Sequence, residues 1–277
     1  AWADVERGQV AGATVDMGLR EVATRLGEQL PELALERVDG RVVASWGAQG
    51  FQVASDDLSF RTQDGLDWPA SKLRLAHDNG LSRGANASAT TTVEADRLDL
   101  AALAALATRV PLPQASRDLL TSLRPAGQVQ GLSARWQQPV APAAAAGQPP
   151  APAPAVTAYQ AKGRVSGLAL AGQPSGRMSA YGPYPELGRP GVAGASADFD
   201  FHQGGGTARV SITDGALELP GMFEQPQIPL SSLQADARWS VSGERIEVWL
   251  ENMRMANADA AGTGRLHWTT ADPARSN

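Results

Sequence analysis

The sequence predicts a mainly β protein, in which an elongated, curved antiparallel sheet forms an open or taco-like groove and a short helical hairpin is inserted. Two observations carry this prediction. In the last third of the chain, apolar and polar residues alternate, as strand side chains do between the two faces of a sheet. The chain also contains 29 Gly and 19 Pro residues, which suit frequent chain reversals. A sheet with one apolar face therefore accounts for most of the chain.

Residues 1–98 are predicted to form a first β-meander. Apolar residues alternate on both sides of Asp39–Gly40, and an Asp-Gly pair between two such runs predicts a hairpin turn. Further along, Asp56–Asp57 interrupts another alternating run. Because adjacent strand residues point to opposite faces, we interpret this pair as a bulge or polar edge rather than as a cation site.

Residues 99–125 are predicted to form the helical insertion, because the apolar period changes there. Leucines recur at helical spacing from Leu100 to Leu106 in an Ala-rich run that Asp99 can cap. Two prolines end this helix, and a second short helix follows before Pro125. Such a hairpin would cover an edge or an end of the sheet.

The remainder of the chain is predicted to return to strands. Residues 126–138 read as one strand, and residues 139–156 form a mobile loop, since they consist almost wholly of Ala, Pro, Gly and Gln. Residues 157–277 form a second β-meander, continuous with the first sheet. Within it, Thr213–Gly215 and Ser242–Glu244 are predicted to be turns between alternating runs.

Composition argues against several classes of function. The net charge is −5 and basic residues do not cluster, so we predict no nucleic-acid partner. The chain has no Cys, which excludes disulfides, cysteine zinc sites and a cysteine nucleophile. His77, His202 and His267 form no chelating pair, and the sequence shows neither a G-x-S-x-G elbow nor an ordered carboxylate pair. We therefore predict that the chain is not an enzyme and carries neither a metal nor a cofactor.

Several sequence blocks in a characteristic order cover most of the chain. The most specific is Arg254–Gly262. The other blocks are the Leu-rich helix with 111–113, 119–127 continuing to Trp136, Tyr159–Leu168, Pro190–Gly191, Leu217–Pro220 with Phe223, Pro226 and Pro229, and Trp239. Together they resemble the AsmA-like superfamily of bacterial envelope proteins, and in particular its large YhdP-type members.

The resemblance implies a long periplasmic protein anchored in the inner membrane by an amino-terminal helix that is absent from this chain. The chain starts without Met and contains no apolar run of about 18 residues, so we expect an internal segment of such a protein. Its sheet would form a groove that shields phospholipid acyl chains between the inner and outer membranes. Expected partners are these acyl chains, neighbouring segments of the same long chain, and envelope proteins at either membrane.

The predicted lipid-binding lining is a set of apolar residues from the alternating runs of the last third. Charged side chains are absent from this set, which would give little selectivity for the lipid head group. The members are Val210, Ile212, Leu217, Leu219, Leu233, Trp239, Val241, Ile246, Val248 and Leu250.

Two other functions stay open on sequence grounds. A structural or partner-docking module would close its apolar face on itself as a sandwich or barrel, and periodicity does not distinguish it from an open groove. A glycan-binding or hydrolytic β domain would need clustered exposed aromatic residues or paired carboxylates. The seven Trp residues are dispersed along the chain, so this reading ranks last.

Overall fold

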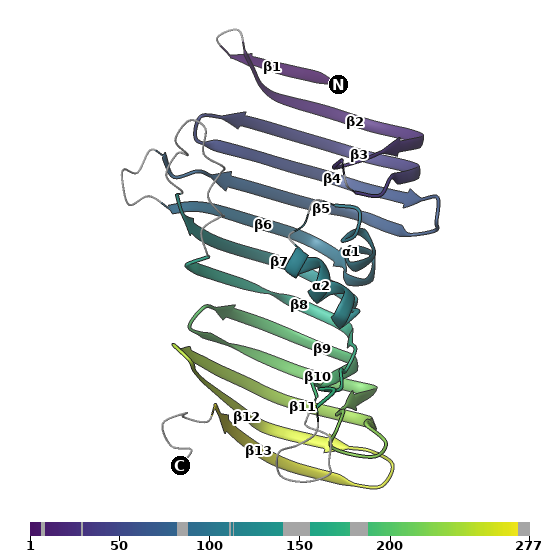
Figure 1. Ribbon diagram of the computed structural model, residues 1–277, viewed down its shortest axis with the longest axis vertical. Coiled ribbons are helices and arrows are strands. Elements are labelled where there is room, and N and C mark those ends of the chain that lie inside the picture. Colours follow the sequence, from purple (N-terminus) through teal and green to yellow (C-terminus); the bar gives the residue numbers. More distant parts are fainter. Residues whose placement is uncertain are drawn as a thin grey trace. The chain divides into compact units, whose positions relative to one another are not determined.

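The computed structural model describes residues 1–6, 9–28, 30–81, 88–110, 112, 114–140, 156–177 and 188–270. Its strands form one open, 13-stranded sheet in which spatial order follows chain order, and the two helices are short (Figure 1). Because chain neighbours pair antiparallel throughout the registered part, short reversals suffice to connect them. The predicted fold class is confirmed: mainly β, antiparallel, unclosed and with a small helical insertion.

The strands are mostly longer than an average strand. Their bounds are β1 Trp2–Glu6, β2 Gln9–Thr24, β3 Leu33–Gly47, β4 Gly50–Thr62, β5 Asp67–Asp78, β6 Ser88–Asp99, β7 Ala126–Pro139, β8 Ala158–Leu170, β9 Gly191–His202, β10 Gly205–Glu218, β11 Gln227–Ser242, β12 Arg245–Ala256 and β13 Ala261–Thr269. The helices α1 (Leu100–Leu106) and α2 (Gln114–Leu123) lie between β6 and β7. Most of the predicted loop at 139–156 lies outside the described residues.

The chain divides into two compact units. The first comprises Ala1–Val22, Ala34–Arg97 and Gly131–Lys162, and the second comprises Ala23–Leu33, Leu98–Gln130 and Gly163–Asn277. In the first unit, the Phe60 and Trp68 rings stack with centroids 5.6 Å apart. Trp68 is buried, and its indole N–H donates to the Ser71 hydroxyl at 3.0 Å. This unit therefore has an aromatic core of its own.

Two of the predicted turns are wrong, because the strands run through them. β3 passes through Asp39–Gly40, where the register with β4 shifts and Gly40 has φ of 139°. β10 likewise passes through Thr213–Gly215, where Asp214 has φ of 50° and the register with β9 shifts. A residue with positive φ fits a β-bulge as well as a turn, so the same residue types occur in both structures. The bulge expected at Asp56–Asp57 is confirmed by the register shift there.

The helical insertion belongs to the second unit and begins as predicted. The Asp99 carboxylate accepts a hydrogen bond from the Ala102 N–H at 2.8 Å, which satisfies one free donor of the first turn of α1. The far end of the insertion is tied to the end of β8, because the Leu123 carbonyl accepts from the Ala171 N–H at 2.8 Å. Figure 1 shows both helices in front of the sheet in that view.

The core of the second unit lies between β9, β10 and β11. Ala195, Ile212 and Leu230 are 3%, 2% and 2% exposed. Partly buried apolar residues pack around them: Leu168, Val192, Leu217, Ile228, Leu233 and Met255. This cluster sits at one end of the strands, so it anchors the sheet there and leaves the other end less covered.

Candidate functional site

One face of β9–β13 carries apolar side chains in consecutive cross-strand positions. Partners on neighbouring strands project to the same side, so strand register defines the face. Trp239 of β11 lies opposite Val248 of β12, and Val248 lies opposite Trp268 of β13. The pairs Val241 with Ile246, Ala237 with Leu250, Leu250 with Leu266, and Ile212 with Leu233 continue the pattern. We call this side of β9–β13 the apolar face.

An aromatic group occupies the β9–β11 part of the apolar face. The ring centroids of Phe201 and Trp239 are 6.2 Å apart, and Phe199 lies 5.8 Å from Phe201. Gly206 lies opposite both Phe201 and Trp239 in the register. A Cβ at Gly206 would come within 2.4 Å of the Phe201 Cβ and 2.7 Å of the Trp239 ring, so only glycine lets these rings meet across β10.

The structure brings most of the predicted lining residues onto the apolar face. Eight of them are strand residues that share it by register: Val210, Ile212, Leu233, Trp239, Val241, Ile246, Val248 and Leu250. Leu217 packs against the buried cluster, and Leu219 follows the end of β10. Ile212 is only 2% exposed and is part of the core, whereas Ile246 is 37% exposed. Whether the set binds lipid remains a prediction.

Sequence reasoning missed several members of the apolar face. Phe199 and Phe201 belong to it, and Leu266 and Trp268 extend it onto β13 with 48% and 50% exposure. Apolar and polar residues alternate at 197–201 and 264–268, and this alternation was the sequence signal for these members of the apolar face. The register with the neighbouring strands was needed to assign these residues to the same side.

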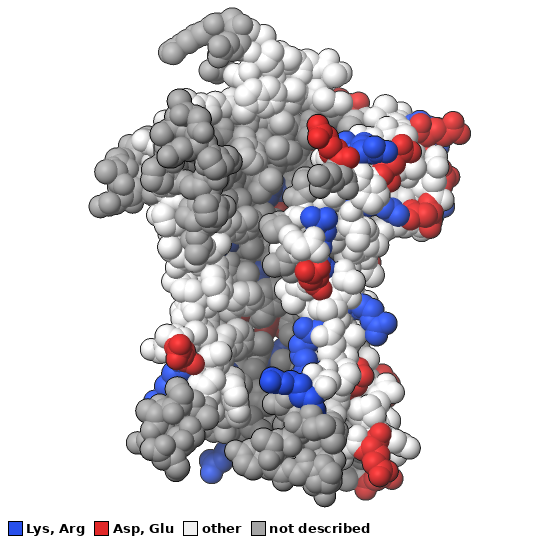
Figure 2. Space-filling view, viewed as in Figure 1, with Lys and Arg blue, Asp and Glu red and all other residues white. Residues whose placement is uncertain are grey.

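The opposite side of the same strands, the polar face, carries three cross-strand rows. The first row is Ser196, Ser211, Gln234 and Arg254, the second is Asp198, Arg209, Asp236 and Glu251, and the third is Asp200, Thr207, Arg238, Trp249 and His267. Charged residues are concentrated on this side. In the face displayed in Figure 2, charged side chains of both signs lie at the margins, and several Lys and Arg side chains also lie nearer the middle.

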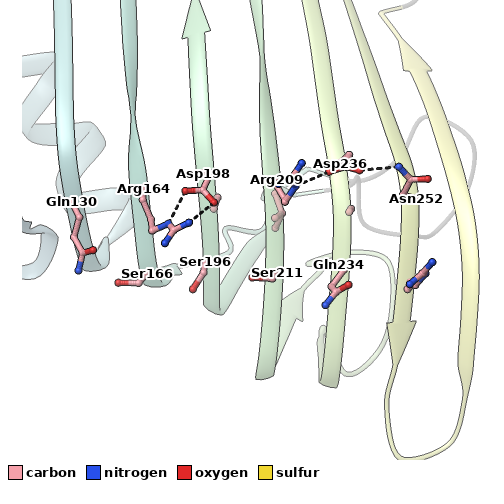
Figure 3. Close-up of a pocket in the computed structure, with 14 residues that line it drawn as sticks. Gln130, Arg164, Ser166, Ser196, Asp198, Arg209, Ser211, Gln234, Asp236 and Asn252 are labelled. Carbon is pink, nitrogen blue, oxygen red and sulfur yellow. Dashed lines mark hydrogen bonds and ion pairs between the residues drawn. The ribbon is translucent and has the colours of Figure 1, made fainter.

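Ion pairs link the second row across the strands (Figure 3). Arg164 of β8 donates twice to Asp198, with Nε to Oδ1 at 2.6 Å and Nη2 to Oδ2 at 2.9 Å. Asp236 accepts from Arg209 Nε at 3.3 Å and from the Asn252 side-chain amide at 2.8 Å. Arg164 lowers the pKa of Asp198, and the hydrogen bonds from Asn252 and Arg209 lower the pKa of Asp236. Both carboxylates are therefore held in their charged form.

Two cavities border this row of ion pairs. A cavity of about 700 Å³ lies within the second unit. Its lining comprises the residues of the first two rows other than Glu251, the apolar residues Ala197, Val210 and Ala235 that alternate with them, and Gln130, Arg164, Ser166 and Asn252. A cavity of about 480 Å³ lies between the second and third rows, and Asp198, Arg209 and Asp236 border both cavities. Figure 3 shows the side chains of the larger cavity projecting from β7–β12.

No cluster of three His, Cys, Asp or Glu side chains suited to a metal occurs in the described part of the chain. Among the described helices, none combines the length and apolar character needed to cross a membrane.

These features define the class of protein: one with an open antiparallel sheet whose last strands carry an apolar face on one side and rows of charged residues on the other. A family model described as YhdP protein matches residues 1–276. The chain therefore belongs to the YhdP family, and it is a bacterial envelope protein of the AsmA-like kind. No curated protein and no solved structure matches it.

Proposed function

We propose that this chain is a segment of a lipid transport protein whose apolar face shields phospholipid acyl chains as they pass between the inner and outer membranes. The observation that carries the proposal is the register of β9–β13, which places apolar partners side by side without a charged residue among them. Several of these side chains are accessible, including Ile246, Leu266 and Trp268. An accessible apolar surface of this kind is typical of a binding site.

Physical chemistry explains what such a face would do. Each methylene that leaves water contributes about 0.8 kcal/mol, so shielding six methylenes offsets about 5 kcal/mol of the cost of holding an acyl chain in an aqueous compartment. Neighbouring strands are about 4.8 Å apart, so the five strands β9–β13 span about 19 Å across the sheet. The surface therefore accommodates a substantial part of an acyl chain lying across the strands.

The face offers no fixed charge to the lipid head group. The charged residues of these strands project from the polar face, so a head group would stay in water at the margin of the sheet. The movement of an acyl chain along this face is a transfer between apolar surfaces, and it needs neither catalysis nor a cofactor. We place the protein in the periplasm, as part of a chain anchored in the inner membrane, with neighbouring segments and envelope proteins at either membrane as partners.

Site-specific photo-crosslinking in bacterial cells tests the proposal. Leu266 and Arg265 are neighbours on β13, both are exposed, and their side chains project to opposite faces. A photoreactive residue at Leu266 should give phospholipid adducts, whereas the same residue at Arg265 should give few. Equal yields at the two positions, or none at Leu266, would contradict a lipid-shielding apolar face.

A further inference from the structure

A third cavity lies at the margin of the sheet, within the second unit, where four strands start or end. Its volume is about 360 Å³. Glu218 at the end of β10 and Arg124 just after α2 are its charged residues. The rest of the lining is neutral and mostly small: Ala169, Leu170, Ala171, Val192, Ala193, Ala216 and Gln227. The apolar face offers a lipid head group no charge, whereas this cavity offers one of each sign.

The Glu218 carboxylate is seated between two glycines. Its Oε2 accepts a hydrogen bond from the Gly172 N–H at 2.9 Å. A Cβ at Gly172 would lie 2.7 Å from the Glu218 Cδ, and a Cβ at Gly191 would lie 2.8 Å from Oε2, so glycine at both positions lets the side chain lie here. Glu218 is half-buried, and no cation pairs with it in the part of the chain that the structure describes. Its other oxygen, Oε1, is therefore available to a ligand.

Arg124 occupies a backbone position where glycine is usual. It follows the last residue of α2 with φ of 44°, and its N–H donates to the Leu120 carbonyl at 3.0 Å, which is the arrangement that ends many helices with a left-handed residue. A residue with a Cβ is strained there, and such strain is concentrated at functional sites. Among the described residues, none forms an ion pair or hydrogen bond with the Arg124 guanidinium.

The end of α2 does not need this guanidinium as a cap. A basic side chain at the end of a helix often satisfies the last carbonyls. Here the Ser122 hydroxyl donates to the Leu119 carbonyl at 3.0 Å, and the Gln173 side-chain amide donates to the Ser122 carbonyl at 2.8 Å. The Leu123 carbonyl accepts from the Ala171 N–H at the end of β8 (Figure 1). The guanidinium is therefore a surplus donor.

The two charged groups converge on the chain just after β8. Leu123, which precedes Arg124, bonds to Ala171, and the Glu218 carboxylate bonds to the next residue, Gly172. Both groups line one cavity, yet no ion pair joins them. A free anion would meet the carboxylate as well as the guanidinium, and a free cation would meet the guanidinium as well as the carboxylate. A ligand that carries both charges satisfies both groups.

We infer that this cavity binds the phosphoethanolamine head group of a phospholipid, with the phosphate at Arg124 and the primary ammonium at Glu218. A guanidinium donates two hydrogen bonds to a phosphate, and a carboxylate accepts from an ammonium. The choice of phosphate rests on the proposed function, which brings phospholipids to this sheet with their head groups at its margin. Two partly exposed ionic contacts bind weakly, so we expect a dissociation constant of about 1 mM for the head group alone.

Titration of the 277-residue chain with two soluble head groups tests the cavity without acyl chains. Glycerophosphoethanolamine carries a phosphodiester and an ammonium, whereas glycerophosphoglycerol carries the phosphodiester alone. The chain should bind the first saturably, with chemical-shift changes at the amides of Arg124 and Gly172, and should bind the second at least about tenfold more weakly. Absence of saturable binding, or equal binding of both compounds, would overturn the inference.

Two substitutions separate ligand binding from a structural role. Glu218→Gln keeps an oxygen that accepts from the Gly172 N–H and removes the charge, so binding should weaken by about tenfold with little change in Tm. Arg124→Gly removes the guanidinium and relieves the backbone strain, so binding should weaken at least about tenfold while Tm rises by about 2 °C. Unchanged binding in either variant would refute the site, and a fall in Tm for Arg124→Gly would assign the guanidinium a structural role instead.

Arg265→Gln on β13 is the matched control. Arg265 is exposed, lies outside this cavity and has no ion-pair partner among the described residues, so its loss should change neither binding nor Tm. Weaker binding in Arg265→Gln, equal to that in Arg124→Gly, would mean that general positive charge attracts the ligand, and would contradict a defined site.

Lipid competition and a variant of the apolar face distinguish this inference from the proposed function. Phosphatidylethanolamine in bicelles should displace glycerophosphoethanolamine, and failure to displace it would overturn the assignment to a lipid head group. Leu266→Asp alters the exposed end of the apolar face, so it should reduce phospholipid adducts and leave glycerophosphoethanolamine binding unchanged. Loss of glycerophosphoethanolamine binding in Leu266→Asp would contradict a separate head-group cavity.

Discussion

Two isoleucines on the apolar face provide a matched test of how that face is divided between core and open surface. Ile212 of β10 is 2% exposed within the buried cluster, whereas Ile246 of β12 is 37% exposed. Both residues lie in strands, and both project to the same side of the sheet by register. The same substitution, Ile→Ala, at the two positions therefore isolates the effect of burial.

The structure gives the expected size of each effect. Ile→Ala removes three carbon atoms, which corresponds to about 2.4 kcal/mol of transfer free energy at a fully buried site, and the cavity left behind raises the cost to about 3–4 kcal/mol. At Ile246 roughly two thirds of the side chain is covered and water fills the vacated space, so we expect about 1–1.5 kcal/mol. The difference between the two variants should be about 2 kcal/mol.

Thermal unfolding followed by calorimetry and circular dichroism measures this difference. For a chain of this size, about 1 kcal/mol corresponds to roughly 2–4 °C in Tm, so Ile212→Ala should lower Tm by about 9 °C and Ile246→Ala by about 3 °C. Equal losses would mean that the face is covered uniformly. That result would refute the distinction between an anchored end and an accessible end of these strands.

Three further sets of substitutions probe the bulge at Asp214, the row of ion pairs and the cap of α1. Asp214→Gly should stabilise the chain by about 0.5–1 kcal/mol in urea unfolding, because φ is 50° there, whereas Thr213→Gly should destabilise it. Arg164 lowers the pKa of Asp198, so the stability that this pair contributes is present above the unfolded carboxyl pKa of about 4 and is lost as pH falls through the lower folded-state value. The Tm of Asp198→Asn should therefore fall less between about pH 5 and pH 2 than that of the unmodified chain. Asp99→Ala should cost about 1 kcal/mol at α1, and Asp99→Asn should restore most of it.

Much of the fold followed from local patterns in the sequence. The change of apolar period at Asp99 located the helical insertion, and the cap was predicted at the residue that forms it. The turn at Ser242–Glu244 was also correct, since β11 ends at Ser242 and β12 begins at Arg245. In each case the signal lies within a few neighbouring residues.

The errors arose where one local signal serves two structures. Asp39–Gly40 and Thr213–Gly215 contain residues that tolerate positive φ, which both a hairpin turn and a bulge within a long strand require. The length of the resulting strand decides between them, and that length depends on pairing with neighbours. Local composition therefore predicted a reversal where the chain continues straight on.

The polar face could not be assembled from the sequence at all. Arg209 and Asp236 are 27 residues apart, and Arg164 and Asp198 are 34 residues apart. A one-residue slip in register would move one member of each pair to the other face. The row of ion pairs and the two cavities beside it become visible only once the register of the five strands β8–β12 is fixed.

Lipid occupancy tests the central claim most directly. Val248 lies between Trp239 and Trp268 on the apolar face, so Val248→Asp places a carboxylate where an acyl chain would lie. An acyl chain lying on this position requires the carboxyl group to be uncharged. Protonating it at pH 7 costs about 4 kcal/mol, which corresponds to about a thousandfold loss of affinity for the acyl chain at this position. Thr207→Asp adds the same charge to the polar face and serves as the matched control.

The measurement is native mass spectrometry with lipid extraction on the chain and both variants, purified from bacterial cells and shown to be folded by circular dichroism. The account predicts bound phospholipid on the unmodified chain and on Thr207→Asp, and at least about tenfold less on Val248→Asp. A folded, lipid-free chain that also excludes added phospholipid, or equal lipid on both variants, would contradict it.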